Sequence, residues 1–343
     1  MFKGCYTALV TPMKKNLEVD YDGLHQLIDY QVECGVEGIL VMGTTGESAT
    51  LNWEEHETVI ERGHEYINDM VTTIAGTGSN STDESLKGTD FVFSIGVRSV
   101  LLVDPYYNGP SSLEIRKEYV EPLAEKFPEI QFIPYVIPGR TGTQLLPQDL
   151  AILHENLSNV NAVKEATGDL KNMELTRKLC GEDFDILSGD DDKTFEMMTS
   201  PQIKANGVIS VISNVVPKGV SDMVRALNRG STEVATELAK GLDPFFKIVT
   251  VRTTEDTPYG SRLVKARNPV PCKTLLNLLG MPSGPCRRPL GKMTKEGLET
   301  VLKYARKVYE TNPELLEPIE DFFDVDMSKR LYEERYWSKL HYV

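Results

Sequence analysis

The feature of this sequence that most limits its fold is a regular alternation of short apolar runs with longer amphipathic stretches. Strands that alternate with helices form a parallel sheet whose faces are covered, and eight units of roughly 25 to 30 residues predict a (β/α)8 TIM barrel. The apolar runs are rich in Val and Ile, and loops with Gly, Pro, Asn or Thr follow them. There are eight runs: CYTALV (5–10), GILVMG (38–43), TTIAGTG (72–78), SVLLVD (99–104), IQFIPYVI (130–137), NAVKEA (161–166), FDILSG (184–189) and GVISVIS (207–213).

The stretches between these runs carry helix signals. Asn52 is placed to cap a helix that begins at the next residue, and residues 20–35 hold four apolar residues on one helical face: Leu24, Leu27, Ile28 and Val32. An open doubly wound sheet is the alternative architecture, but no GxGxxG sequence follows the first run.

The strand pattern stops after about residue 215, and helical patterns continue to the end of the sequence. We therefore expect a catalytic barrel over residues 1–228 and a C-terminal helical domain with an extended tail over residues 229–343. The final stretch, from residue 313 onward, contains many acidic residues, and we expect an acidic linker followed by a terminal helix or arm.

Bulk composition excludes several classes of protein. The formal net charge of −14 repels phosphate backbones, so we expect no nucleic-acid partner, and any anionic substrate needs a local cationic pocket. No apolar run approaches the roughly 18 residues of a membrane span, and the first residues lack a signal peptide's pattern, which favours a cytoplasmic protein with no membrane contact. Dispersed cysteines and histidines without ligand spacing predict neither disulfides nor a metal site.

One lysine interrupts an otherwise apolar run. Lys164 stands in the sixth run, where burial of a charged ammonium is unfavourable. Burial lowers the pKa of a lysine, and the neutral amine can attack a carbonyl carbon to form an iminium, which is an electron sink. The alternatives are an ion pair with Glu165, which would point to the opposite face of the strand, or a side chain that extends to solvent.

Polar residues follow the carboxyl ends of the runs, where the active sites of (β/α)8 barrels lie. They supply hydroxyls, phenols and a guanidinium but no His or Cys: Thr44, Thr45, Tyr106, Tyr107, Tyr135, Arg140 and Ser188. This set excludes Ser-His-Asp and Cys-His catalysis, and amine chemistry at Lys164 remains. Taken one at a time, the threonines are more simply explained as helix caps and the tyrosines as packing residues.

Seven segments occur in the same order as in one known family of enzymes. They are GTTGESATL (43–51), AGTGSNST (75–82), DPYYNGPS (104–111), PGRTG (138–142), VKEATGD (163–169), LSGDD (187–191) and GVISVISNVVP (207–217). Together with NPVPCKTLLNLLG (268–280), they resemble the dihydrodipicolinate synthase / N-acetylneuraminate lyase family of class I aldolases. The resemblance extends from about residue 4 to 290 and implies a (β/α)8 barrel with a C-terminal helical domain.

The resemblance also implies roles for individual residues. Lys164 forms a Schiff base with pyruvate without another cofactor, Tyr135 exchanges protons with the enamine, and Thr44 with Tyr107 connects that tyrosine to solvent. The equivalent of Tyr107 crosses a dimer interface in the family, so a homodimer or homotetramer is implied. Three further residues are implied to bind pyruvate or line its pocket: Thr45, Gly189 and Ile209.

Arg140 bears on the choice of the second substrate. The PGRTG segment resembles the synthase branch of the family, where this arginine binds the carboxylate of L-aspartate-4-semialdehyde. A planar guanidinium also suits a carboxylate better than a neutral polyol. The resemblance therefore implies a lyase that condenses pyruvate with this aldehyde in lysine biosynthesis through diaminopimelate.

Three points remain open at this stage. One alternative activity is a pyruvate-dependent lyase for a sugar acid of the N-acetylneuraminate or 2-keto-3-deoxy-gluconate type, and another possibility is a non-catalytic protein that binds lysine. An acidic neighbour paired with Arg140 would be the simpler explanation of that residue. Val136 stands where the family usually has Asn, and because it alternates away from Tyr135 we expect only a packing change.

A second set of residues resembles the family's lysine-inhibition site at the dimer interface. The set consists of Ser48, Ala49, Trp53, His56, Asn80, Glu84 and Tyr106. Glu84 is expected to hold the ammonium of L-lysine, and the adjacency of Tyr106 to Tyr107 provides a route for coupling between the two sites. The alternative is that His56 and Glu84 are solvated helix residues.

Overall fold

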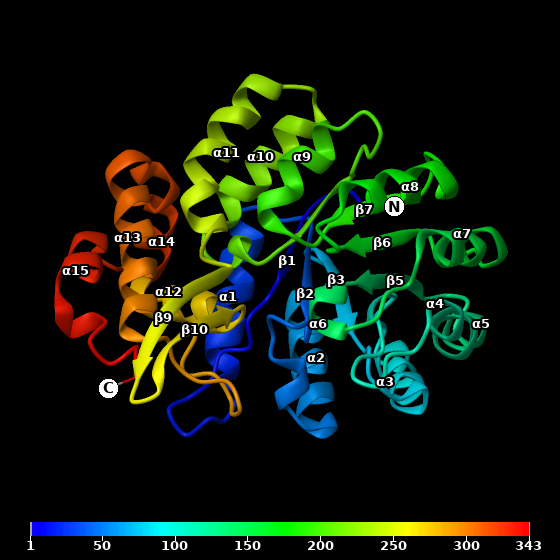
Figure 1. Ribbon diagram of the computed structural model, residues 1–343, viewed down its shortest axis with the longest axis horizontal. Coiled ribbons are helices and arrows are strands. Elements are labelled where there is room, and N and C mark those ends of the chain that lie inside the picture. Colours follow the sequence, from blue (N-terminus) through cyan, green and yellow to red (C-terminus); the bar gives the residue numbers. More distant parts are fainter. Residues whose placement is uncertain (1, 343) are drawn as a thin grey trace.

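The computed structural model describes residues 2–342, and its core is a closed parallel barrel in which the strands follow one another in sequence order (Figure 1). The strands are β1 (Gly4–Ala8), β2 (Gly38–Val41), β3 (Thr72–Gly76), β4 (Ser99–Val103), β5 (Gln131–Val136), β6 (Ala162–Glu165), β7 (Asp185–Ser188) and β8 (Gly207–Ser210). β1 pairs with both β2 and β8, which closes the sheet. All eight predicted strands are confirmed, and the open doubly wound alternative is wrong.

Helices surround this barrel on its outer side, except that the short α6 lies at its mouth (Figure 1). They are α1 (Tyr21–Glu33), α2 (Trp53–Ile67), α3 (Thr82–Ser94), α4 (Ser112–Glu114), α5 (Glu121–Lys126), α6 (Pro138–Thr141), α7 (Pro147–Asn156), α8 (Leu170–Cys180), α9 (Thr194–Thr199) and α10 (Pro217–Asn228). Asn52 caps α2 as predicted, because its side chain accepts a 2.9 Å hydrogen bond from the Glu55 amide. No helix in residues 2–342 is long and apolar enough to cross a membrane.

Alternate strand residues point into two separate apolar cores. The inner core fills the barrel and contains Tyr6, Ala8, Leu40, Ile74, Leu101, Ile133, Tyr135, Ala162, Ala166, Leu187 and Ile209. Lys164 of β6 lies two residues from Ala162 and two residues from Ala166, which directly follows the strand. Its side chain therefore points inward, as theirs do. Val136 belongs to the outer core between barrel and helices, which confirms that it points away from Tyr135.

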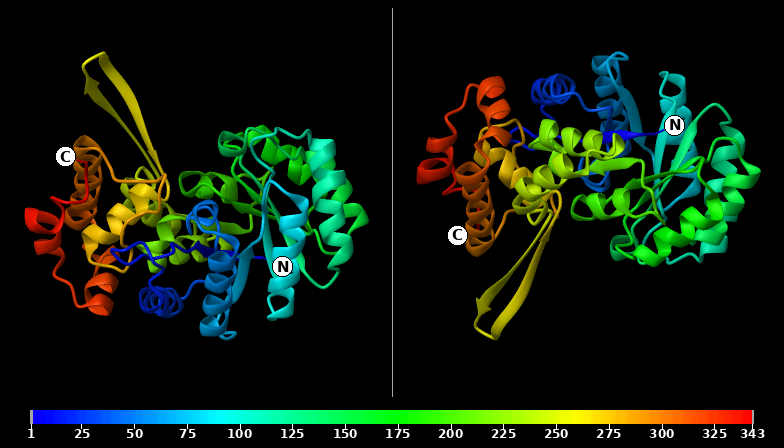
Figure 2. Two further views of the ribbon diagram at one scale, coloured as in Figure 1. Left: turned by 90° about the horizontal axis from the view of Figure 1, so that it is seen from below. Right: turned by 90° about the horizontal axis from the view of Figure 1, so that it is seen from above.

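The C-terminal region differs from the sequence prediction. Its longer elements are α11 (Thr232–Phe246), β9 (Thr250–Thr257), β10 (Gly260–Arg267), α12 (Val270–Leu279) and α13 (Lys295–Thr311). The expectation that only helices follow residue 215 is wrong, because β9 and β10 form an antiparallel hairpin that projects from the body (Figure 2). Much of this hairpin is exposed, so it lacks the continuous apolar run that identified the barrel strands.

The tail is packed against the body instead of forming an acidic linker. It folds into η5 (Pro313–Leu315), α14 (Glu317–Phe323), α15 (Met327–Tyr332) and η6 (Glu334–Tyr336). Leu316, Ile319 and Leu331 are fully buried, and the Arg330 guanidinium donates a 2.7 Å hydrogen bond to the Leu278 carbonyl at the end of α12. The acidic composition misled the prediction because the charged residues lie outward while one apolar face is buried.

A buried ion pair joins the barrel to the C-terminal region. The Lys273 ammonium of α12 lies 2.5 Å from the Glu47 carboxylate in the loop after β2, and the two side chains are 1% and 0% exposed. The ammonium also donates to the carbonyls of Thr11 and Pro285, and the second Glu47 oxygen accepts from the Arg287 amide. Every hydrogen of the ammonium therefore has a partner, which a buried charge requires.

Replacement of Lys273 by Met should lower the free energy of unfolding by about 3–5 kcal/mol, since it leaves the Glu47 carboxylate buried without its counter-charge. The measurement is urea denaturation of the whole chain. Lys240→Ala, which removes an exposed ion pair with Glu237, provides the control and should cost less than about 1 kcal/mol. Equal losses in the two variants would contradict a structural role for the buried pair.

Candidate active site

Two residues from neighbouring strands meet at the carboxyl end of the barrel. The register of β5 and β6 places Tyr135 beside Lys164, and the Lys164 ammonium lies 4.1 Å from the centre of the Tyr135 ring. The Thr44 side chain lies close enough to the Tyr135 hydroxyl to lower the pKa of that phenol. Thr44 in turn lines a cavity of about 770 Å³ at this end of the barrel. An amine, a phenol and a hydroxyl thus lie next to one another at the end of the barrel that opens into the cavity.

The surroundings of Lys164 favour its neutral form. Burial lowers the pKa of Lys164 from its ordinary 10.5 to about 8, although Asp190 and Asp191 act in the opposite direction. Glu165 points elsewhere, because its carboxylate accepts hydrogen bonds from the Thr167 amide and the Asn172 side chain at 2.7 and 2.9 Å. Lys164 is 4% exposed, so both the ion pair with Glu165 and the solvent-directed side chain are wrong.

Tyr135 is held as a neutral phenol. Burial raises its pKa well above the ordinary value, and only Arg140 and the neighbouring Thr44 side chain act against that effect. A phenol that stays protonated can donate a proton to an adjacent oxygen and recover one from carbon through the same hydroxyl. The arrangement therefore provides proton transfer next to Lys164 without a histidine.

Thr45 is oriented by a residue that the sequence did not single out. Its hydroxyl oxygen accepts a 2.9 Å hydrogen bond from the Asn268 side-chain amide, and both residues are buried. Since the oxygen is occupied as an acceptor, the Thr45 hydrogen is directed toward another acceptor, such as a carboxylate. Asn268 was visible in the sequence only as part of the NPVP segment, far from Thr45 along the chain.

Gly189 leaves room for the Lys164 side chain. A Cβ atom at Gly189 would lie 2.8 Å from the Ala166 Cβ and 3.2 Å from the Lys164 Cε, so a larger residue would displace the lysine. Ile209 of β8 completes the inner core close to this point. Asp191, the last residue of the LSGDD segment, accepts hydrogen bonds from the Ser210 hydroxyl and the Val211 amide.

Arg140 lies in α6 at the edge of the same cavity. Its guanidinium donates a 2.9 Å hydrogen bond to the Asn268 carbonyl, and it forms no ion pair with a carboxylate among residues 2–342. Asp190 lies within electrostatic range of the guanidinium. Burial raises the pKa of Asp190 to about 6, with smaller contributions from Asp192 and Asp191, while Lys164 and Arg140 act in the opposite direction. The simple explanation of Arg140 as half of a surface ion pair is therefore wrong.

Tyr107 is the one predicted catalytic residue that the chain does not bring to Lys164. Its side chain is 90% exposed, and its backbone has a φ of 78°. A bulky residue rarely adopts this left-handed conformation, which carries an energetic cost unless something favours it. Within the single chain, the Tyr107 side chain therefore lies in solvent, whereas Tyr135 is buried.

The predicted effector residues gather on another side of the same cavity. Six of them line it: Ser48, Ala49, Trp53, His56, Glu84 and Tyr106. The seventh, Asn80, accepts a 2.9 Å hydrogen bond from the Tyr106 amide. His56 is buried against the Gly76 carbonyl at 2.7 Å, and burial lowers its pKa. The alternative explanation of His56 as a solvated helix residue is therefore wrong. Glu84, the other residue in that alternative, is exposed.

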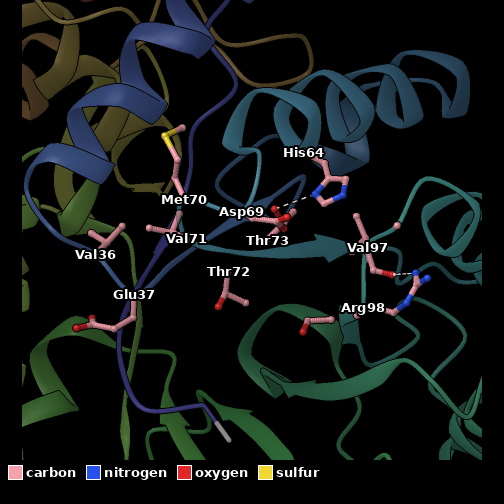
Figure 3. A pocket seen from close by; sticks show the side chains of 12 residues that line it. Val36, Glu37, His64, Asp69, Met70, Val71, Thr72, Thr73, Val97 and Arg98 are labelled. Atoms are coloured by element: carbon pink, nitrogen blue, oxygen red, sulfur yellow. Dashed lines mark hydrogen bonds between the residues drawn. The ribbon is translucent and has the colours of Figure 1, made fainter.

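A second cavity, of about 500 Å³, lies at the opposite end of the barrel near the amino ends of β2, β3 and β4 (Figure 3). Its polar groups are engaged in the fold: the His64 ring contacts the Thr73 hydroxyl at 3.1 Å, and Arg98 donates to the Val97 carbonyl. In residues 2–342, no three His, Cys, Asp or Glu side chains are placed to share a metal ion. The groups suited to covalent chemistry thus lie at the carboxyl end, as expected for this fold.

The sequence matches the Dihydrodipicolinate synthetase family over residues 1–308. It is 39% identical to the 4-hydroxy-tetrahydrodipicolinate synthase of Methanococcus maripaludis strain S2 over 85% of this chain and 94% of that protein, and 41% identical to that of Syntrophus aciditrophicus over 87% and 96%. The dihydrodipicolinate synthase of Thermotoga maritima matches the structure with a TM-score of 0.81 at 33% identity, over 90% of this chain and 99% of that chain. The enzyme of Cyanidioschyzon merolae, solved with lysine bound, gives 0.81 at 32% identity over 90% and 98%.

Lys164 should titrate near pH 8, well below the ordinary lysine pKa of 10.5. Asp190→Asn should lower this pKa further, because the Asp190 carboxylate stabilises the ammonium form. The pKa is measured by NMR after reductive methylation with a ¹³C label. Asp192→Asn, a change at an exposed neighbour, is the control and should have a smaller effect. A Lys164 pKa at the ordinary value would show that the amine is not desolvated.

Proposed function

Because the chain belongs to the dihydrodipicolinate synthetase family, we propose that it is a 4-hydroxy-tetrahydrodipicolinate synthase, which condenses pyruvate with L-aspartate-4-semialdehyde. The observation that carries the proposal is the desolvated Lys164 amine in contact with the neutral phenol of Tyr135. A neutral amine is the form that attacks a ketone, and a neighbouring acid is needed to remove the ketone oxygen as water.

In the proposed first stage, the Lys164 amine attacks the carbonyl carbon of pyruvate to give a carbinolamine. Tyr135 donates its proton to the departing hydroxyl, so water leaves and the iminium forms. The Thr45 hydroxyl, held as a donor by Asn268, binds the pyruvate carboxylate. Tyr135 then takes a proton from the methyl carbon, which converts the iminium into a nucleophilic enamine. Thr44 passes protons between Tyr135 and solvent.

In the proposed second stage, the enamine carbon attacks the aldehyde carbon while Arg140 holds the carboxylate of the second substrate. Tyr135 supplies the proton that the new alkoxide needs. The amino group of the condensed product then attacks the iminium carbon, closes the ring and releases the Lys164 amine. This sequence uses the chain's own side chains and the covalent Schiff base, with no further cofactor.

We further propose a homodimer or homotetramer in which Tyr107 from a neighbouring subunit completes the proton relay. Two features support this proposal: the exposed phenol and the left-handed backbone that presents it outward. A residue held in a costly conformation at the surface is consistent with a role that requires a second chain.

Treatment with pyruvate and borohydride should add one reduced pyruvyl group at Lys164, since borohydride traps an iminium as a stable amine. Peptide mass spectrometry identifies the modified residue. Lys164→Arg is the control and should remain unmodified. Absence of an adduct in the wild-type protein would rule out both the synthase and the sugar-acid lyase, and would leave the non-catalytic lysine-binding protein.

Arg140→Ala separates the two activities that share the Schiff base. It should lower kcat/KM for L-aspartate-4-semialdehyde by about 10- to 100-fold, since charge-assisted hydrogen bonds contribute roughly 1.5–3 kcal/mol. Trapping of pyruvate at Lys164 should persist in this variant. Unchanged turnover of the semialdehyde, or cleavage of a sugar acid by the wild-type protein, would favour the lyase.

We also propose that L-lysine inhibits the enzyme at the residues around Trp53 and Glu84. The lining of one cavity by these residues and by Thr44 supports the proposal, as does the structure of a relative with lysine bound. Glu84→Gln should weaken inhibition by about tenfold or more through loss of the carboxylate partner of the lysine ammonium. Asp83→Asn is the neighbouring control. An activity curve that stays flat at high millimolar L-lysine would contradict inhibition.

A further inference from the structure

The β9–β10 hairpin reaches the mouth of the proposed active site. Lys265 and Arg267 at the base of β10 line the same cavity as Thr44 and Arg140. Two reciprocal hydrogen bonds join the hairpin base to α6: the Arg267 guanidinium donates to the Gly139 carbonyl at 3.0 Å, and Arg140 donates to the Asn268 carbonyl at 2.9 Å. The hairpin is therefore attached to the loop that carries Arg140.

One face of this hairpin concentrates positive charge. The strand register places Arg252 directly opposite Lys265, and Arg267 lies two residues further along the same face. Like charges directly across a pair of strands destabilise the sheet. On the other face, by contrast, Arg262 lies opposite Glu255 and forms an ion pair with it at 2.6 Å.

The three cations lack acidic partners within the chain. Among residues 2–342, no carboxylate forms an ion pair with Arg252, Lys265 or Arg267. Lys265 is exposed, and its pKa is lowered most strongly by Arg267, with smaller effects from slight desolvation, Arg252 and Arg140. These four charges are thus close enough to repel one another, and an anion placed between them would relieve that repulsion.

The position of this charge is unusual for the protein as a whole. The chain has a net charge of −14, so a small anion meets a repulsive field over most of the surface. Two of the cations, Lys265 and Arg267, line the cavity that leads to Thr44, and Arg252 lies opposite Lys265 in the hairpin. Positive charge at the entrance of a cleft focuses the field and raises the local concentration of an anionic substrate.

We propose that Arg252, Lys265 and Arg267 form an entrance subsite for small carboxylate anions, which captures pyruvate at the mouth and directs it toward Lys164. The proposal rests on the proposed function for the identity of the anion. It assigns to the hairpin a role in substrate capture that is separate from the covalent chemistry. The paired Arg262 on the opposite face has no such role.

The test compares kcat/KM for pyruvate at ionic strengths of about 10 mM and about 150 mM, between which the Debye length shortens from about 30 Å to about 8 Å. The wild-type value should fall as salt rises. The R252Q/K265Q/R267Q variant should be about 3- to 10-fold lower at low salt, a modest part of the range for electrostatic steering, and should approach the wild-type value at high salt.

Two further variants make the comparison specific. Arg262→Gln removes a charge from the opposite face of the same hairpin and should retain the wild-type salt dependence. Arg267→Lys preserves the charge and should retain most of the wild-type salt dependence, even though the contact with Gly139 changes. A salt dependence in the triple variant equal to that of the wild type would overturn the proposal. A loss that persists unchanged at high salt would also overturn it, because it would indicate damage to the mouth.

Failure of the proposed function gives a different result. In that case treatment with pyruvate and borohydride leaves Lys164 unmodified. The entrance subsite is then tested separately, by calorimetric titration of pyruvate into the wild-type and triple-variant proteins at low salt. Weaker binding by the variant supports the subsite without any turnover. Equal binding, or an adduct at Lys164 with an unaltered salt dependence, rejects the subsite alone.

Discussion

The buried ion pair between Glu47 and Lys273 fixes the loop on which the proposed pyruvate site depends. Thr44 and Thr45 directly precede this loop's turn at Glu47, whose φ of 62° is unusual for a non-glycine residue. The ammonium of Lys273 and the amide of Arg287 hold the carboxylate in place, so the strained backbone is compensated by charged hydrogen bonds. The C-terminal region therefore helps to position the hydroxyls of Thr44 and Thr45 in the loop after β2.

Closure of the barrel supplies the second constraint, the desolvation of Lys164. The inner core excludes water from its side chain, and the resulting change of pKa from 10.5 to about 8 corresponds to roughly 3 kcal/mol of disfavoured charging. Because the folded pKa lies below the unfolded one, this cost is absent above about pH 10.5 and is fully present below about pH 8. Asp190 and Asp191 act against this shift by stabilising the ammonium, so burial is what makes part of the amine neutral near physiological pH.

The barrel was predictable from the sequence because each buried parallel strand is a nearly continuous apolar run. The hairpin was missed for the opposite reason: both of its faces are largely exposed, and its alternating Thr, Arg and Glu residues resemble a loop. Lys164 could be found because a charge in an apolar run is a local signal. Its partners Asp190 and Asp191, and the contact of Asn268 with Thr45, depend on tertiary proximity that no spacing reveals. Tyr107 points to solvent in the isolated chain, so its proposed contact requires a second subunit.

Asn268 shows why the region beyond the barrel belongs to the site and is more than an appendage. Its side-chain amide donates to Thr45, and its backbone carbonyl accepts from Arg140. These are the groups proposed to bind the carboxylates of the two substrates, so one residue sets the separation between them. The preceding residue, Arg267, is the last residue of β10, and its guanidinium donates a hydrogen bond to the Gly139 carbonyl of α6. The segment formed by Arg267 and Asn268 therefore couples the proposed positions of the two substrate carboxylates to the positive charge at the entrance. A shift in the base of the hairpin would displace all three together.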